Sequence, residues 1–311
     1  MAMAAQPRAT RARSASCLLR SSQAVADAYG LYGAGAPHAV DYLPNGVVQC
    51  RCERCEAWCE FTRSGGSHGQ PIYLLPTCDL VEGLALWLVR EHRKLAAHAP
   101  MRVLEVGAGD GTLALHLRAA LSRSEPPDRA NPITVVASDS GELGLVPAAG
   151  IDVLAMSTDA ALDAVAPHIV ICAFMPLGHD WTAAFRACPS VRRYLLLGEV
   201  DEGCCGRPWA TWGYLCDGDD DAEDVRVSST SGSSSDEDEE EQPSSQSRSY
   251  RTDEAWRRVY EYEPLRTPHG AAGWERAELV ELQATLVCRT DQCWSGTRHA
   301  KAIVFSRERD P

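Results

Sequence analysis

The 311-residue chain lacks any apolar run that approaches the roughly 18 residues needed for a membrane-spanning helix. It also lacks the G-x-x-x-x-G-K-[ST] motif of a P-loop, which argues against a site that cradles nucleotide phosphates. Apolar residues still make up 45% of the chain, the usual share for a globular protein. We therefore expect a folded protein without membrane association, long enough for one full domain with extra segments.

The chain has little positive charge to offer a nucleic acid. Its net charge is −13, and fourteen acidic residues against three arginines between positions 217 and 254 supply −11 of it. The remainder is close to neutral and has no strongly basic patch, so nucleic-acid binding is not indicated. The acidic stretch is too polar to order itself, and we predict a disordered insertion over 217–252. Ser233, Ser234 and Ser235 each precede an acidic residue by three positions, which suggests modification by an acidophilic kinase.

The N-terminus lacks the apolar core of a secretory signal. Its first 25 residues contain four arginines, four serines and no acidic residue, which fits either a disordered tail or an organelle transit peptide. We predict such a segment over residues 1–40 and a location in the cytoplasm or nucleus, with organelle targeting as the alternative. Without a secretory signal, the thirteen cysteines are expected to be reduced thiols rather than a disulfide framework.

Four cysteines fall within ten residues of the next predicted segment, 41–79. They follow the pattern C-x-C-x2-C-x3-C at Cys50, Cys52, Cys55 and Cys59. Four thiolates could hold a structural zinc ion, but such sites usually combine two separated C-x2-C pairs, and only Cys52 and Cys55 have that spacing. The competing interpretation is a surface hairpin with free thiols, and the sequence alone assigns no metal site.

The most informative feature that is present joins a strand, a glycine turn and a helix. An apolar run ends at Val106, and Gly107, Gly109 and Gly111 follow before an amphipathic helical pattern begins. Glycines allow the backbone to turn sharply and to approach a bound ligand closely. Their spacing differs from the G-x-G-x-x-G of dinucleotide-binding folds. The carboxylate of Glu105 would repel a pyrophosphate but would suit a cationic ligand with a free amino group.

These residues resemble motif I, E-x-G-x-G-x-G, of the class I S-adenosylmethionine-dependent methyltransferases. The resemblance implies an α/β fold with a doubly wound, mostly parallel seven-stranded sheet and helices on both faces, which we place at residues 80–311. It also implies that S-adenosylmethionine is the cofactor and that the glycine turn contacts its methionine part. The residues assigned to the cofactor in this way are Glu105, Gly107, Ala108, Gly109 and Gly111.

Acidic residues follow the next two expected strands. The strand 133–138 ends at Asp139, whose carboxylate can accept hydrogen bonds from both ribose hydroxyls or can cap the following helix. The strand 151–155 is followed by Asp159, which by the resemblance is a candidate for the exocyclic amine of adenine and could equally cap a helix. We assign both residues to the cofactor site.

The expected acceptor side follows the next two strands. The strand 169–173 is followed by Phe174 and the sequence M-P-L. By the resemblance, N6-adenine and N5-glutamine methyltransferases carry [DN]-P-P-[YF] at this place. Methylation of adenine N6 or of glutamine N5 is therefore disfavoured. We count Phe174 with the cofactor site. His179 or Asp180 is placed to act as a general base, and Glu199 ends the following strand, which makes these three the catalytic candidates.

The methyl acceptor is not named by these patterns. The blocks M-P-L-G-H-D-W-T and G-E-V-D-E-G-C-C-G resemble a eukaryotic methyltransferase-like group, which implies no particular substrate. Carboxylates near the acceptor would repel phosphates, so we expect a protein side chain or a small molecule rather than a nucleic acid. The alternative function is a catalytically inactive methyltransferase fold that acts as a binding or scaffold protein.

Two outer elements complete the prediction. The last two strands are expected at 279–288 and 299–306, as an antiparallel pair at the sheet edge. The helical pattern over 80–95 is expected to cover the cofactor pocket, with Arg90 or Glu91 near the cofactor, although a helix that only packs on the core would show the same pattern.

Overall fold

The structure is a computed structural model, and the residues it describes are 19–33, 40–42, 48–50, 52–95, 99–124, 131–199, 205–213, 267–293 and 298–307. The predicted acidic insertion, 217–252, and most of the predicted tail, 1–40, lie outside these ranges. Within them, no helix is both long enough and apolar enough to cross a membrane.

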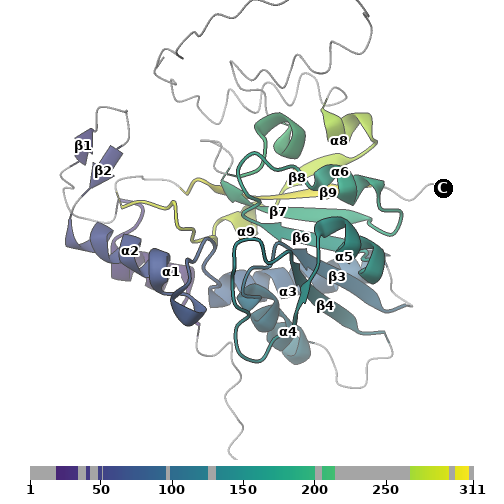
Figure 1. The fold of residues 1–311 in the computed structure, drawn as a ribbon, viewed down its shortest axis with the longest axis horizontal. Coiled ribbons are helices and arrows are strands. Elements are labelled where there is room, and N and C mark those ends of the chain that lie inside the picture. Colours follow the sequence, from purple (N-terminus) through teal and green to yellow (C-terminus); the bar gives the residue numbers. More distant parts are fainter. Residues whose placement is uncertain are drawn as a thin grey trace, which may run out of the picture.

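A seven-stranded sheet forms the centre of the molecule (Figure 1). Its strands are β3 (Met101–Val106), β4 (Ile133–Asp139), β5 (Val153–Ala155), β6 (Ile169–Ala173), β7 (Arg193–Glu199), β8 (Glu275–Glu278) and β9 (Ala300–Ser306). Their order is β5-β4-β3-β6-β7-β9-β8. Strand β9 runs antiparallel to both of its neighbours, and the other pairs are parallel. The predicted fold class is confirmed.

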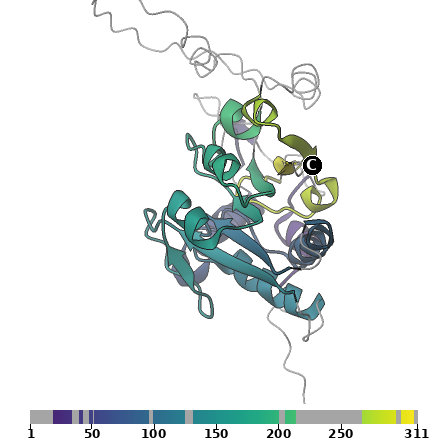
Figure 2. The same cartoon turned by 90° about the vertical axis from the view of Figure 1, so that its right-hand side faces the viewer.

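Helices cover both faces of the sheet, as the turned view shows (Figure 2). One face carries α3 (Cys78–Leu95), α4 (Thr112–Ser124) and α9 (Val280–Gln283). The other carries α5 (Thr158–Val165), α6 (Thr182–Ala187), the π-helix η3 (Pro208–Trp212) and α8 (Pro268–Ala271). Side chains alternate along each strand, so Leu195 and Leu197 join the first core whereas Tyr194 and Leu196 join the second.

The chain reverses its direction of winding between β3 and β6. From β3 it moves outward to β4 and β5, then returns to place β6 on the other side of β3. In open α/β sheets, ligands bind outside the carboxyl ends of the strands at such a switch point. The connection from β4 to β5 contains no helix, and it folds back so that the Ala148 amide donates to the Asp110 carbonyl at 2.8 Å. This loop therefore lies beside the glycine turn.

The N-terminal segment is a separate group of small elements. They are α1 (Ser22–Tyr29), β1 (Val40–Tyr42), β2 (Val48–Cys50), α2 (Glu53–Ser64) and a short 3-10 turn (Ser67–Gly69). Val25 of α1 and Trp58 of α2 form a small core with Val287, from the chain between α9 and β9. Figure 1 shows this late segment, in yellow, running out from the sheet to the purple helices.

Helix α1 lies inside the stretch predicted to be a disordered tail, so the prediction is wrong for residues 22–29. Ser21 caps the helix, and the amide and hydroxyl of Ser22 donate to the carboxylate of Asp79 at the start of α3. These contacts, together with the packing of α1 against α2, order a short helix whose sequence gives only a weak helical signal.

Two further predictions are corrected. The strand expected at 279–288 is instead β8 at Glu275–Glu278, followed by the short helix α9. Its polar sequence E-R-A-E suits an exposed edge strand, whereas the apolar residues after it pack as a helix. Helix α3 packs on the sheet beside α4, which is the core-packing alternative to the expected cover of the cofactor pocket. Glu91 pairs with Arg193 at 2.5 Å, at the start of β7, and Arg90 is exposed.

Candidate active site

The glycine turn connects β3 to α4 in the conformation that its sequence predicts. Gly107, Gly109 and Gly111 have φ values of +64°, +57° and +75°, a region that side-chain-bearing residues rarely adopt. A Cβ atom on Gly107 would lie 2.9 Å from the Trp181 ring, and one on Gly111 would lie 2.7 Å from Val153. Glycine is therefore needed both for the turn and for the close approach of neighbouring groups.

Glu105 is a buried acid directly before this turn. Its side chain accepts a hydrogen bond from the Ala114 amide in the first turn of α4, while its Oε2 atom has no hydrogen-bond partner among the described residues. Burial raises the pKa of Glu105 to about 8, and the nearby carboxylates of Asp110 and Asp139 act in the same direction. A buried carboxylate with an unused oxygen is suited to a cationic partner, because the cation would offset the cost of burying the charge.

Asp139 lies at the end of β4, in contact with the glycine turn. Its two carboxylate oxygens accept hydrogen bonds from the Gly109 amide at 2.9 Å and from the Gly141 amide at 2.8 Å. The side chain is half-buried, so part of it remains accessible to solvent. The structure thus brings Asp139 to the glycine turn, and its proposed bond to ribose stays a prediction.

The loop after β4 gathers apolar side chains beside Asp139. Leu143 and Val146 are exposed at 66% and 48% of their surface, and Leu145 lies against Gly109. Small-molecule sites are lined mostly by apolar side chains, so this loop can contribute to a site at the carboxyl ends of the strands. Asp159 is exposed in the first turn of α5, but the cap of that helix is Ser157, whose hydroxyl accepts from the Ala160 amide. The adenine contact predicted for Asp159 stays a prediction.

Phe174 follows β6 with a backbone angle φ of +56°, which is strained for an aromatic residue. Its amide donates to the Leu197 carbonyl of β7 at 2.7 Å, and its ring lies 6.2 Å from the ring of Tyr73. Strain of this kind costs of the order of 1–3 kcal/mol and tends to occur where a site fixes the backbone. The residue marks the carboxyl end of β6 as a functional candidate.

The loops after β6 and β7 are joined into one unit. The Gly206 amide donates to the Met175 carbonyl, and the Gly178 amide donates to the Gly206 carbonyl, both at 3.1 Å. Asp180 accepts from the Thr182 hydroxyl at 2.6 Å and from the Thr211 hydroxyl at 3.2 Å. Both sequence blocks singled out above therefore meet here, and Asp180 connects them rather than facing solvent.

His179 and Trp181 lie on the open side of this unit. The His179 side chain is exposed, its ring lies 6.2 Å from the Trp181 ring, and Trp181 in turn covers Gly107. His179 is therefore connected to the glycine turn through the Trp181 ring. Glu199 differs from it, because its side chain is only 2% exposed at the end of β7, where Ala300 of β9 pairs with it. A role for Glu199 in direct contact with an acceptor stays a prediction.

Three residues near the turn were not assigned to the cofactor by the sequence. Trp181 and Leu145 contact the glycines, and Tyr73 reaches Phe174 from the N-terminal segment. The apolar residues in the glycine-rich stretch after β4 could have indicated that Leu145 lies near the site. Nothing in the sequence around Tyr73 connects it to a motif more than thirty positions away.

Comparisons with known proteins find solved structures of similar fold that share little sequence identity with this chain. No protein-family model matches the chain, and no curated protein matches its sequence. Among solved structures, the CurJ carbon methyltransferase aligns with 73% of this chain and 53% of its own, at 12% identity and a TM-score of 0.35. Thus the match spans about half of that protein.

Two other solved structures are similar in the same way. The magnesium protoporphyrin IX methyltransferase from Synechocystis PCC 6803, solved with bound SAM, covers 73% of this chain and 78% of its own at 12% identity, with a TM-score of 0.31. The plantazolicin methyltransferase BpumL, in complex with SAH, covers 74% and 85% at 9% identity, with a TM-score of 0.32. These values are too low to assign a function to this chain.

Proposed function

We propose that the chain is an S-adenosylmethionine-dependent methyltransferase that transfers the methyl group directly to an acceptor. The observation that supports this most is Glu105, whose buried carboxylate keeps one oxygen without a partner among the described residues, beside a turn of three glycines. A phosphate ligand would be repelled by Asp139 and by the ionised form of Glu105, whereas the ammonium group of a methionine moiety would be attracted and would favour that ionised form.

The residues present fit this cofactor. Glu105 would bind the ammonium group, the glycine backbone would lie along the methionine part, and Asp139 would accept from the ribose hydroxyls. Leu145, Val146 and Met156 supply apolar surface for a base at the edge next to β5. When bound, the cofactor supplies a sulfonium-activated methyl group.

The chain's own residues then have mainly to align the acceptor and to exclude water. Phe174 and Trp181 provide apolar walls at the switch point, next to Gly107. His179 is the residue placed to take a proton from an acceptor whose nucleophile needs one removed. Direct transfer requires no covalent intermediate, which agrees with a site that contains no nucleophilic triad among its described residues. A protein side chain or a small molecule is the preferred acceptor class.

The cofactor assignment is tested by isothermal titration of the full chain with S-adenosylhomocysteine, S-adenosylmethionine and NAD. We expect binding of the first two and none of NAD. Replacing Asp139 by Ala should weaken binding by about 10- to 150-fold, since a charge-assisted hydrogen bond contributes roughly 1.5–3 kcal/mol. Asp163→Ala is the matched control, because this exposed aspartate lies on α5.

Asp139→Asn is a milder variant, because its single amide oxygen can still accept from either the Gly109 or the Gly141 amide, whereas its NH2 group cannot accept from the other. Unchanged affinity in both Asp139 variants would contradict the ribose assignment. Binding of NAD alone would overturn the proposed function. Gly107→Val is a poor probe, because its side chain would collide with Trp181 even without a ligand.

The alternative of an inactive scaffold makes a different prediction. Transfer of a radiolabelled methyl group from the cofactor into cell extract, lost in Asp139→Ala and reduced in His179→Ala, would favour an enzyme. Tight cofactor binding without any transfer to protein or small-molecule fractions would favour the scaffold.

A further inference from the structure

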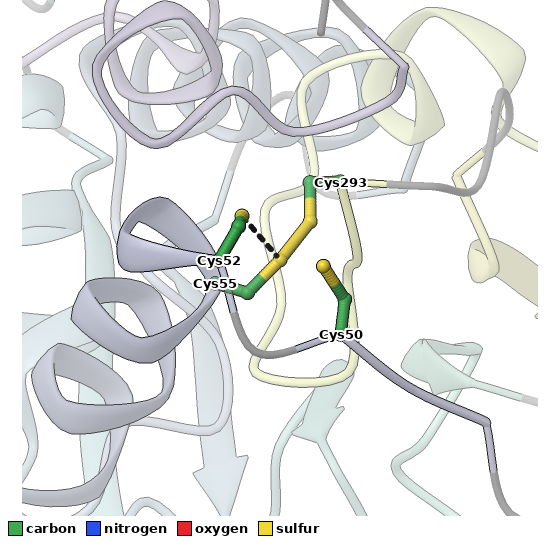
Figure 3. Close-up of side chains that lie close together, drawn as sticks. All are labelled: Cys50, Cys52, Cys55 and Cys293. Atoms are coloured by element: carbon green, nitrogen blue, oxygen red, sulfur yellow. Dashed lines mark hydrogen bonds between the residues drawn. A yellow bond between two sulfur atoms is a disulfide. The ribbon is translucent and has the colours of Figure 1, made fainter. Parts of the chain in front are cut away.

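Four cysteine side chains converge at the junction between the N-terminal segment and the late chain segment before β9 (Figure 3). They are Cys50, Cys52, Cys55 and Cys293, and their sulfur atoms all lie within 4.8 Å of one another. Cys55 and Cys293 are joined as a disulfide, and the Cys52 thiol lies 3.3 Å from the Cys55 sulfur. Three members belong to the cluster noted in the sequence, but the fourth is not Cys59, which is exposed.

Three parts of the fold supply the four ligand positions. Cys50 ends β2, Cys52 caps the N-terminus of α2, and Cys55 lies in its first turn. Cys293 arrives from the other end of the chain, held where the Gly33 amide donates to the Cys293 carbonyl at 2.8 Å. A C-x2-C pair at a helix start, joined by two outside cysteines, provides four thiolates around one point.

The cluster is enclosed. Cys50, Cys55 and Cys293 are exposed by 6%, 5% and 1%, and together they form a small buried cluster with the partly buried Cys52. In a tetrahedral zinc site with Zn–S bonds of about 2.3 Å, the sulfur atoms lie about 3.8 Å apart, so this cluster has the right size for a single ion. An iron–sulfur cluster would need its ligand sulfurs further apart, because several iron atoms lie between them.

We propose that the reduced form of this cluster binds one structural Zn²⁺ ion through Cys50, Cys52, Cys55 and Cys293. Metal binding requires the Cys55–Cys293 disulfide to gain two electrons and two protons from a thiol reductant, which itself becomes a disulfide. The four thiols then release four protons as they bind the ion. The zinc site connects β2 and α2 to the chain before β9, and the disulfide is its metal-free, oxidised form. This conclusion is independent of the methyl-transfer proposal.

The decisive experiment measures zinc in the full chain, expressed without a metal-binding tag and purified with a phosphine reductant. We expect about one equivalent of zinc by elemental analysis, and Co²⁺ in its place should show the visible absorption of a tetrahedral thiolate site. Cys50→Ser and Cys293→Ser should retain less than about a tenth of the metal of the wild type. Cys59→Ser is the matched control and should retain all of it.

A further variant keeps the test meaningful if a serine variant fails to fold. Cys293→His preserves four ligands, because zinc accepts Cys3His sites, so it should retain the metal with a changed Co²⁺ spectrum. The proposal is overturned if reduced wild-type protein holds no zinc at micromolar free Zn²⁺. It is also overturned if Cys59→Ser loses as much metal as Cys293→Ser. A Cys55–Cys293 disulfide found in most protein from thiol-blocked cells would likewise contradict it.

Discussion

The glycine turn takes its three glycines and Glu105 from one continuous stretch of chain, whereas the cysteine cluster joins Cys55 to Cys293 across 238 positions. At the turn, neighbouring residues dictate the conformation, because a buried strand must reverse into a helix and only glycine tolerates the backbone angles involved. At the cluster, no local pattern dictates the partner. The packing of α1 and α2 against the chain around Val287 brings Cys293 into reach.

The two regions are stabilised in different ways. The sheet core is continuous and apolar on both faces, so its stability comes from burial. The N-terminal segment has a small core of five buried residues, and it relies on polar contacts as well. One of them joins the Tyr32 hydroxyl to the Asp291 carboxylate at 2.5 Å, and Arg298 donates to the same hydroxyl at 2.8 Å.

The largest effect is expected when one aromatic side chain is truncated in each region, because the two variants should destabilise different parts of the molecule. Phe305 is fully buried and stacks on Tyr194 with ring centres 4.6 Å apart, so Phe305→Ala should lower the free energy of unfolding by about 3–5 kcal/mol. Trp58→Ala creates a cavity in the N-terminal core and should loosen that segment while the sheet still binds S-adenosylhomocysteine. Hydrogen exchange with and without that ligand measures both outcomes.

Loss of ligand binding in Trp58→Ala would show that the two regions unfold as one. Phe61→Ala is a useful second variant, because this side chain is only partly buried at the edge of the same core. Its exchange pattern should match that of Trp58→Ala, but at a smaller amplitude.

A smaller effect is expected at Glu105, and it tests whether the glycine turn binds a cationic ligand. Its pKa is raised from 4.5 to about 8 by burial, so the stability linked to its protonated form is fully present below pH 4.5 and is lost as pH rises through about 8. A cationic ligand favours the carboxylate, so binding should release a proton near pH 7. The affinity for S-adenosylhomocysteine should rise between pH 6 and 7.5, by at most about tenfold per pH unit for one proton.

Glu105→Gln should remove this pH dependence, because the amide does not titrate. Titration calorimetry in two buffers of different ionisation heat counts the released protons directly. A wild-type affinity that stays constant from pH 6 to 7.5 would mean that the ligand's ammonium group does not reach Glu105.

The smallest expected effect comes from the acidic insertion, which lies outside the described residues. Its composition leaves it little apolar surface to bury, and long insertions between folded elements cost little. Deleting residues 219–248 should therefore leave the melting temperature and the affinity for S-adenosylhomocysteine nearly unchanged in a thermal shift assay. A large fall in either would show that the insertion packs against the domain.

Much of the sheet could be predicted because its signals are local. Buried parallel strands are continuous apolar runs, and the strands predicted at 133–138, 151–155, 169–173 and 299–306 lie within two residues of β4, β5, β6 and β9. The strand β8 was missed because it is short and polar, and α1 was missed because tertiary contacts order it. The same limit applied to Trp181 and Tyr73, whose places near the site depend on how separate loops pack.

The sequence by itself determined the fold class, the glycine turn and the acids beside it, because strand periodicity and glycine conformations act over a few neighbouring residues. The tertiary structure alone decided that Asp180 joins two loops, that Glu199 is buried, and that Cys293 completes the cysteine cluster. Cys59 looked like the fourth ligand in the sequence, but it lies one helical turn beyond Cys55 and faces solvent. Contacts between distant parts of a chain depend on the packing of whole elements, which no local pattern records.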